Sequence, residues 1–332
     1  MNERRIKKIY LAAILFCLAA AAASLCFGAS NLTLKQLWNA MLGGADSGYE
    51  GYIFWYVRLP RTIAAMAAGA GLSVSGAVIQ GVLANQLASP GIIGVNAGAG
   101  MAVTICCAFG AVSGWVIAGA SFAGALFAVM LVTITAQKMK ASRTTVIMGG
   151  VAVNSFFGAV TESITTLIPE AGMMSSDFRV GGFASVSHLR LIPAVILILL
   201  GLVCVFSLCN ELDLMNLGEE TAGSLGLSVK KMRTILLCIA ALLAGASVSF
   251  AGILGFVGLI VPHTVRRFTG SESRYLLPLC AIGGAGFVTF CDLIARLIFM
   301  PYEIPVGILM SFIGGPFFVW LLLKRKAGHS NA

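Results

Sequence analysis

Charged residues are scarce in this chain, and their scarcity excludes most classes of soluble protein. Only 11% of the 332 residues are Asp, Glu, Lys or Arg, whereas 58% are hydrophobic. Soluble domains carry roughly 25% charged residues because their surface has to be hydrated. No charged residue occurs at the 76 positions between Arg61 and Lys138. Most of the surface of this protein is therefore expected to face lipid.

Residues that build catalytic or metal sites are also few or scattered. The three histidines stand apart from one another, and the nine cysteines form no CxxC pair, so we expect no catalytic residues, no metal site and no disulfide framework. The chain has no GxxxxGK[ST] phosphate-binding motif,. We therefore expect no cofactor in this chain, so that any ATP would have to be hydrolysed by another chain.

Long apolar runs are what the chain has in place of charge. A membrane-spanning helix needs about 20 consecutive apolar residues, and the charge-free stretch after Arg61 is long enough for three crossings. Seven further apolar runs lie near residues 9–28, 144–168, 191–209, 232–254, 256–270, 275–298 and 305–323. The sequence predicts an all-α polytopic membrane protein with about ten transmembrane helices, which form a single domain over residues 1–332.

The basic residues indicate how the chain is oriented. With a cytoplasmic N-terminus, 16 of the 22 Lys and Arg residues fall on the cytoplasmic side, as the positive-inside rule expects. Both termini are then cytoplasmic, in a multi-pass protein of the inner membrane, and the net charge of +9 needs no nucleic acid. The basic start followed by an apolar run is also typical of a signal peptide, but we interpret 9–28 as a retained span.

Two polar stretches adjoin the charge-free region. Arg58 and Arg61 flank Pro60 at the outer mouth of the second span, where proline suits the first helical turn. We expect both arginines to face outside water, as interfacial anchors or as docking points for an acidic partner. The segment 85–91 contains a helix-breaking Pro-Gly pair on the inner side,, and is either a tight turn or part of a gate.

Four ionisable residues lie within or at the ends of expected spans. Asp292 and Arg296 are one helical turn apart, which predicts an ion pair that lowers the cost of charge near lipid. Glu162 has no obvious local partner, and His263 stands without a carboxylate or cysteine neighbour. We interpret His263 as structural, and we assign Glu162 no proton-carrying role.

The inner segment 211–233 holds four acidic and three basic residues between two apolar runs. Its pattern Glu220-x-Ala222-x-x-x-Gly226 resembles the coupling loop of ABC importer permeases. In such loops a short helix–turn–helix docks on the ATPase, and the glycine permits the turn.

Ordered motifs cover nearly the whole chain after about residue 55. They are RLPRTIAAMAAGAGLSVSGAVIQG, NQLASPGIIGVNAGAG, LGEETAGSLGLS, GILGFVGLIVPHTVRRFTG, DLIARL and EIPVGILMSFIGGPFFVWLL. Together they resemble the FecCD-type permease family of ABC importers, which take up iron-siderophores, haem and cobalamin. The chain departs from the family pattern at Gln86, where proline is usual, at Ser89, where an acid is usual, and at Phe178, where tryptophan is frequent.

This resemblance implies a set of partners. They are a second permease copy in a homodimer with the pathway at its interface, two ATP-binding subunits, an extracytoplasmic substrate-binding protein and membrane lipid. The residues implied to contact the ATPase are Glu219, Glu220, Ala222 and Gly226. Those implied to receive acidic residues of the binding protein are Arg58, Arg61 and Arg296, and the inner gate would include Asn85 and Leu87.

The function implied is ATP-driven alternating access, in which a ferric siderophore or a related metal chelate such as haem or cobalamin enters the cytoplasm. An ion-coupled secondary transporter is the alternative. That class needs ionisable or carbonyl-rich sites near mid-membrane, and here the charged candidates lie toward the ends of the spans.

Overall fold

The computed structural model describes residues 3–28, 33–44, 48–138 and 143–329, which form helices joined by short connections without a β-strand among them. The helices are α1 (Glu3–Cys26), α2 (Leu34–Gly43), α3 (Tyr49–Tyr52), the π-helical turn η1 (Ile53–Arg58), α4 (Leu59–Val82), α5 (Val95–Ala108), α6 (Gly114–Lys138), α7 (Arg143–Leu167), α8 (Pro169–Val180), α9 (His188–Ser207), α10 (Cys209–Asn216), α11 (Glu219–Ser224), α12 (Val229–Ala251), α13 (Val257–Thr269), α14 (Ser273–Leu297) and α15 (Val306–His329).

Each of the ten apolar segments expected from the sequence forms a helix, but the helices differ in length. In the described part of the chain, six helices are long and apolar enough to cross a bilayer; α9 and α10, bent by 59° at their junction, meet the same criterion only when they are taken together. α5 and the apolar part of α15 are shorter, and α13 has only 13 residues. At 1.5 Å per residue, α13 is about 20 Å long, less than the ~30 Å hydrocarbon core.

The connection before α5 explains why that helix is short. Between α4 and α5 the chain forms consecutive turns, within which Ala88, Pro90 and Ile93 are buried. Irregular backbone is tolerated at membrane depth only where protein covers it. Pro90 and Gly91 therefore place a buried turn inside the bundle, and this turn leaves fewer residues for α5.

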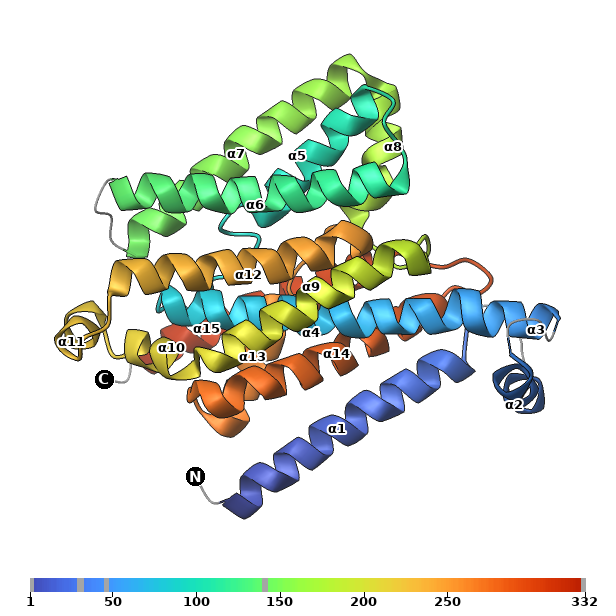
Figure 1. Cartoon of the computed structure of the whole chain (residues 1–332), viewed down its shortest axis with the longest axis horizontal. Coiled ribbons are helices and arrows are strands. Elements are labelled where there is room, and N and C mark those ends of the chain that lie inside the picture. Colours follow the sequence, from blue (N-terminus) through green and yellow to red (C-terminus); the bar gives the residue numbers. More distant parts are fainter. Residues whose placement is uncertain (1–2, 29–32, 45–47, 139–142, 330–332) are drawn as a thin grey trace.

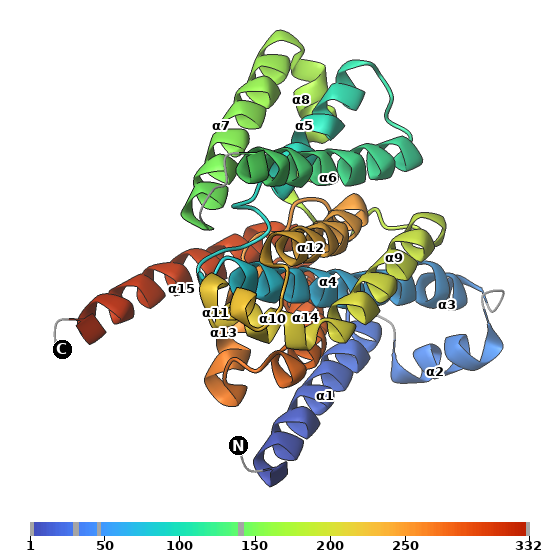
Figure 2. The ribbon, with the colours of Figure 1, turned by 60° about the vertical axis from the view of Figure 1, so that its left-hand side comes forward.

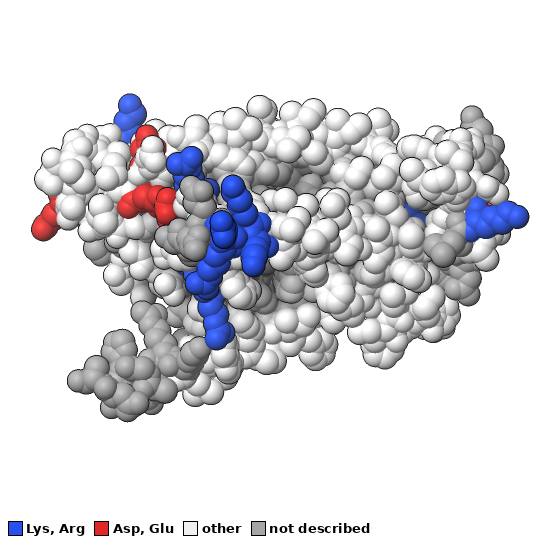
Figure 3. Space-filling view, turned by 90° about the horizontal axis from the view of Figure 1, so that it is seen from below, with Lys and Arg blue, Asp and Glu red and all other residues white. Residues whose placement is uncertain are grey.

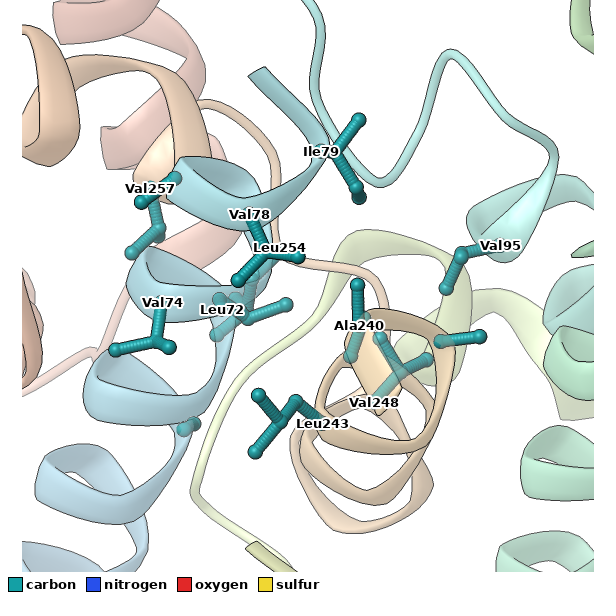
Figure 4. Close-up of a cluster of buried hydrophobic side chains, with 14 of the residues drawn as sticks. Leu72, Val74, Val78, Ile79, Val95, Ala240, Leu243, Val248, Leu254 and Val257 are labelled. Carbon is teal, nitrogen blue, oxygen red and sulfur yellow. The ribbon is translucent and has the colours of Figure 1, made fainter. Parts of the chain in front are cut away.

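α4 is the central helix, packed on α12, α13 and α14 (Figure 1). A methyl group added at Gly69 would collide with the backbone carbonyl of Gly284 in α14, and one added at Gly76 would collide with Gly258 in α13. Small residues let membrane helices approach closely where lipid provides no hydrophobic drive between them. Figure 4 shows the apolar contacts beside this packing, in which Leu72 of α4 lies near Leu243 of α12.

The remaining helices form two groups around this centre. α5, α6, α7 and α8 lie together on one side, where α6 packs on α12, while α1 packs on α14 at the opposite side (Figure 2). The start of α1, the end of α15, α10 and α11 lie at one end of the molecule, and α2 and α3 lie at the other (Figure 1). The start of α1 and the end of α15 therefore lie at the same end of the bundle; that both termini are cytoplasmic remains a prediction from the charge distribution.

Candidate functional sites

A buried charge cluster occupies the end of the bundle that carries α2 and α3. Asp292 of α14 accepts hydrogen bonds from Arg61 of α4, from Nε at 3.1 Å and from Nη2 at 3.0 Å. Arg296, one turn further along α14, lies 3.2 Å from the same carboxylate. Arg61 also reaches Glu303 at 2.6 Å through its second terminal nitrogen. The pair of Asp292 with Arg296 that the sequence predicts is confirmed, and Arg61 and Glu303 join it.

The last turn of α1 contributes to the same cluster. Arg58 donates hydrogen bonds of 2.7 Å to the carbonyls of Leu25 and Cys26. The hydroxyl of Ser24 accepts a 2.7 Å bond from Arg296 and lies 2.8 Å from the hydroxyl of Thr62. The free carbonyls at a helix C-terminus carry partial negative charge and attract cations. α1 thus completes the coordination of two buried arginines.

The expected exposure of Arg58 and Arg61 was wrong. Arg58 is 3% exposed, Arg61 9% and Arg296 3%. Buried charge requires paired and hydrogen-bonded partners, and the sequence offered no local sign that Asp292 and Glu303, more than 200 residues away, would supply them. Arg61 is reached through a cavity of about 170 Å³ that is also lined by Asp177 and Glu303. Docking of a binding protein on Arg58, Arg61 and Arg296 stays a prediction, and its acidic residues would have to reach these arginines within a partly covered cluster.

The second candidate site is the turn after α4, at the opposite end of that helix. The side chain of Asn85 accepts a 3.0 Å bond from the backbone N–H of Leu87, and both residues are half-buried. Next to this turn, Ala84 and Gln86 line a cavity of about 620 Å³ together with His263, Arg266 and Trp320. The predicted gate residues therefore hold a turn at the edge of a cavity, and their gating role remains a prediction.

A polar contact that sequence reasoning missed supports this turn. The side chain of Gln80, 2% exposed, donates to the carbonyl of Gly258 at 3.0 Å and accepts a hydrogen bond from Arg266. These bonds tie the last turns of α4 to α13. A glutamine inside an apolar run was the available signal, because a buried amide needs partners.

The third candidate site is the segment that contains α10 and α11. α11 ends in a turn at Gly226, whose φ of +87° favours glycine,. Ala222 is fully buried, whereas Glu220 and Gly226 are exposed; for Glu219 only the backbone is described, at the start of α11. The helix–turn–helix geometry expected here is present, and contact with an ATPase stays a prediction.

An unforeseen contact anchors this segment to the bundle. Asp213 in α10 accepts bonds from the hydroxyl and the backbone N–H of Ser273 at 2.6 and 2.9 Å. Ser273 is the first residue of α14, the helix that carries Asp292 at its other end. One helix therefore links the α10–α11 segment to the buried charge cluster.

Glu162 differs from expectation because it pairs with Arg179 of α8 at 3.0 Å, with the Glu162 side chain 67% exposed and that of Arg179 39% exposed. Such exposed pairs contribute little to stability. His263 lies with its ring edge toward Phe317 at a centroid distance of 5.8 Å. Among the described residues, no three His, Cys, Asp or Glu side chains gather as metal ligands would.

Comparison with known proteins identifies the arrangement. Residues 14–324 match the profile of the FecCD transport family. The chain belongs to this family. It is 32% identical to the hemin transport system permease protein of Yersinia pestis, over the full length of both chains. It is 37% identical to the vitamin B12 import system permease protein of Vibrio cholerae, with 89% of each chain covered.

A solved structure of a metal-chelate type ABC transporter in an inward-facing conformation superposes with a TM-score of 0.85 at 28% identity, covering 96% of this chain and 99% of the other. As a member of the FecCD transport family, the chain is a multi-pass permease subunit of the inner membrane. ATP hydrolysis belongs to a separate subunit, and ATPase and substrate-binding partners are general to such importers. The ion-coupled alternative is not favoured.

Asp292→Asn should lower the stability of the folded protein strongly, because Arg61 and Arg296 would keep their charges without the carboxylate between them. Loss of one partner of a buried ion pair typically costs about 3 kcal/mol or more. Thermal unfolding in detergent measures the effect. Asp177→Asn makes the same change at an exposed carboxylate and should shift stability by about 0.5 kcal/mol or less; equal shifts for both variants would contradict a buried network.

Proposed function

We propose that two copies of this chain form the translocation pathway of a binding-protein-dependent importer that carries a ferric siderophore or a related chelate, haem or cobalamin, into the cytoplasm. The observation that supports the cargo class is the similarity to permeases named for hemin, over the full length of both chains, and for vitamin B12, over 89% of each chain. These cargoes are bulky chelates. An almost uncharged bundle suits a ligand that is carried as a whole rather than an ion held by protein ligands.

Two cavities that are lined by α15 support a pathway beside this helix. Phe312 lines a cavity of about 520 Å³ toward the start of the helix, and Trp320 lines the 620 Å³ cavity toward its end. Val319, between them, is 55% exposed in the single chain. A second copy facing α15 would cover this apolar side and enclose both cavities between the subunits, and this supports the homodimer.

ATP-driven coupling is proposed to enter through Glu219, Glu220, Ala222 and Gly226. The buried Ala222 anchors the α11 turn to the protein, whereas Glu220 is exposed and accessible to a partner. The bonds between Asp213 and Ser273 then connect movement of this segment to α14. At the other end of α14, Arg58, Arg61 and Arg296 are proposed to receive acidic residues of the binding protein, and Asn85 with Leu87 is proposed to close the inner side. ATP and Mg are proposed to reside on the ATPase.

The proposal is tested by co-purification of this chain with the ATPase and binding protein encoded beside it, followed by ATPase assays in lipid. ATP hydrolysis should rise when the binding protein is loaded with a ferric siderophore, haem or cobalamin, and the chelate that stimulates identifies the cargo. Stimulation by none of these chelates would contradict the cargo class. Uptake that follows an ion gradient without an ATPase would contradict the coupling mechanism.

Gly226→Val should uncouple ATP hydrolysis from transport, because a β-branched residue is strained by at least about 1–2 kcal/mol at positive φ. We expect vesicle uptake to fall severalfold while membrane insertion is unchanged. Gly223→Val is the matched control, since Gly223 is exposed, helical and without neighbours within 4 Å of an added Cβ. Equal uptake by both variants would remove the coupling role of this turn.

Glu303→Gln should strengthen docking of the binding protein, because Glu303 occupies one side of Arg61 and is 31% exposed. Without the Glu303 carboxylate, Arg61 is available to an acidic residue of the binding protein and can form a charge-assisted hydrogen bond with it. We expect a severalfold lower Kd in surface plasmon resonance. Glu162→Gln, which removes an exposed carboxylate paired elsewhere, is the control; an unchanged Kd for Glu303→Gln would argue against docking at Arg61.

A further inference from the structure

A groove of about 480 Å³ lies between α1, α13 and α14, away from the proposed pathway. Its walls are apolar and include Ile9 and Phe16 from α1, Val265 and Phe268 from α13, and Phe287 from α14. The lining hydroxyl of Thr264 is already bonded to the carbonyl of Ile260 in its own helix at 2.8 Å. The groove therefore presents hydrocarbon to whatever fills it.

We expect the groove to open to lipid, because two of its walls are helices that qualify as membrane spans. α1 and α14 both have the length and hydropathy of spans. The groove owes its depth to small residues, Ala12 and Ala13 on α1 and Gly283 on α14. A Cβ at Gly283 would only touch Val261 and Val265, at 3.7 and 3.9 Å, so the space there is open to a flexible chain.

Positive charge stands at one end of the groove. Arg5 precedes Ile9 by four residues and Lys8 precedes Ala12 by four residues, so each continues a groove-lining row of α1 by one helical turn,. Both side chains are exposed. Lys7 instead continues the row of Leu11, which is 58% exposed and does not line the groove, and Arg4 lies one helical turn further from the groove than Lys8.

Neighbouring elements reinforce this charge. Arg267 in the last turn of α13 and Arg274 in the first turn of α14 are exposed, opposed by the exposed Glu272. Seen from the side of α1, the Lys and Arg side chains gather over this part of the surface, while most of the rest carries no charge (Figure 3). An acyl-sized apolar groove that ends in basic side chains is complementary to a membrane molecule that combines an acyl chain with a negatively charged headgroup.

We propose that the groove binds an acyl chain of an anionic phospholipid, with the lipid phosphate held beside Arg5 and Lys8. Basic pockets between transmembrane helices bind anionic headgroups, and each basic residue near the membrane surface contributes about a fivefold gain in affinity. Apolar contact with α1, α13 and α14 retains the chain of the lipid. The bound lipid then joins α1 to the bundle at the end opposite to the Ser24–Arg296 contact.

The test is native mass spectrometry of the full chain, purified in detergent and exchanged against phosphatidylglycerol or phosphatidylcholine. The wild type should retain phosphatidylglycerol preferentially. Arg5→Gln with Lys8→Gln should weaken that retention about twenty-fivefold, the product of two fivefold losses. Arg4→Gln with Lys7→Gln removes the same charge from the same turn of α1 and should leave retention within about twofold of the wild type.

A second variant tests the groove independently of charge. Gly283→Leu fills the space between α13 and α14 and should reduce retention of phosphatidylglycerol, whereas Gly119→Leu, at a site open to lipid with no atom within 4 Å, should not. Thermal unfolding identifies any variant that fails to fold. Equal retention of both lipids by the wild type would overturn the proposal. So would equal losses in the two double variants, or a lipid-free dimer whose second copy covers the groove.

Discussion

A charged group that this chain carries into the bilayer has to find its partner within the protein, because hydrocarbon offers none. The cluster around Asp292 meets this requirement with residues from four parts of the chain: Arg61 from α4, Arg296 from α14, Glu303 from the connection to α15 and Ser24 from α1. These partners fix how the helices meet at one end of the bundle. A buried ion pair is weak support for stability in itself, so its greater effect here is to specify which helices are neighbours.

The same constraint explains why small residues, rather than bulky ones, hold the centre. Helices surrounded by lipid gain little from hydrophobic contact with each other, so α4 contacts α13 and α14 through backbone at Gly76 and Gly69. Many large apolar side chains are exposed on the single chain, whereas others, such as Leu72 and Leu243, are buried in the core beside these backbone contacts. α14 is packed between two polar contacts. One end is Ser273, which is hydrogen-bonded to Asp213, and the other end carries the charge cluster.

Much of the fold and part of the candidate sites could be predicted from the sequence. The apolar runs located ten helices, the i,i+4 spacing of Asp292 and Arg296 predicted their pair, and Gly226 marked a turn whose φ is positive. These predictions succeeded because each depends on neighbours within one helical turn. The exposure of Arg58 and Arg61 was predicted wrongly, and the partner of Glu162 was missed, because both depend on residues that the fold brings from elsewhere.

Low charge, long apolar runs and ordered motifs are properties of the chain alone, and they were sufficient to identify a helical membrane protein of the FecCD transport family. Which arginines are buried, which carboxylates neutralise them and where cavities remain between helices depends on how the helices pack. A cavity exists where side chains from different helices fail to fill the space between them. No single segment carries that information, so the groove beside α1 and the cavities along α15 emerge only when the helices are packed together.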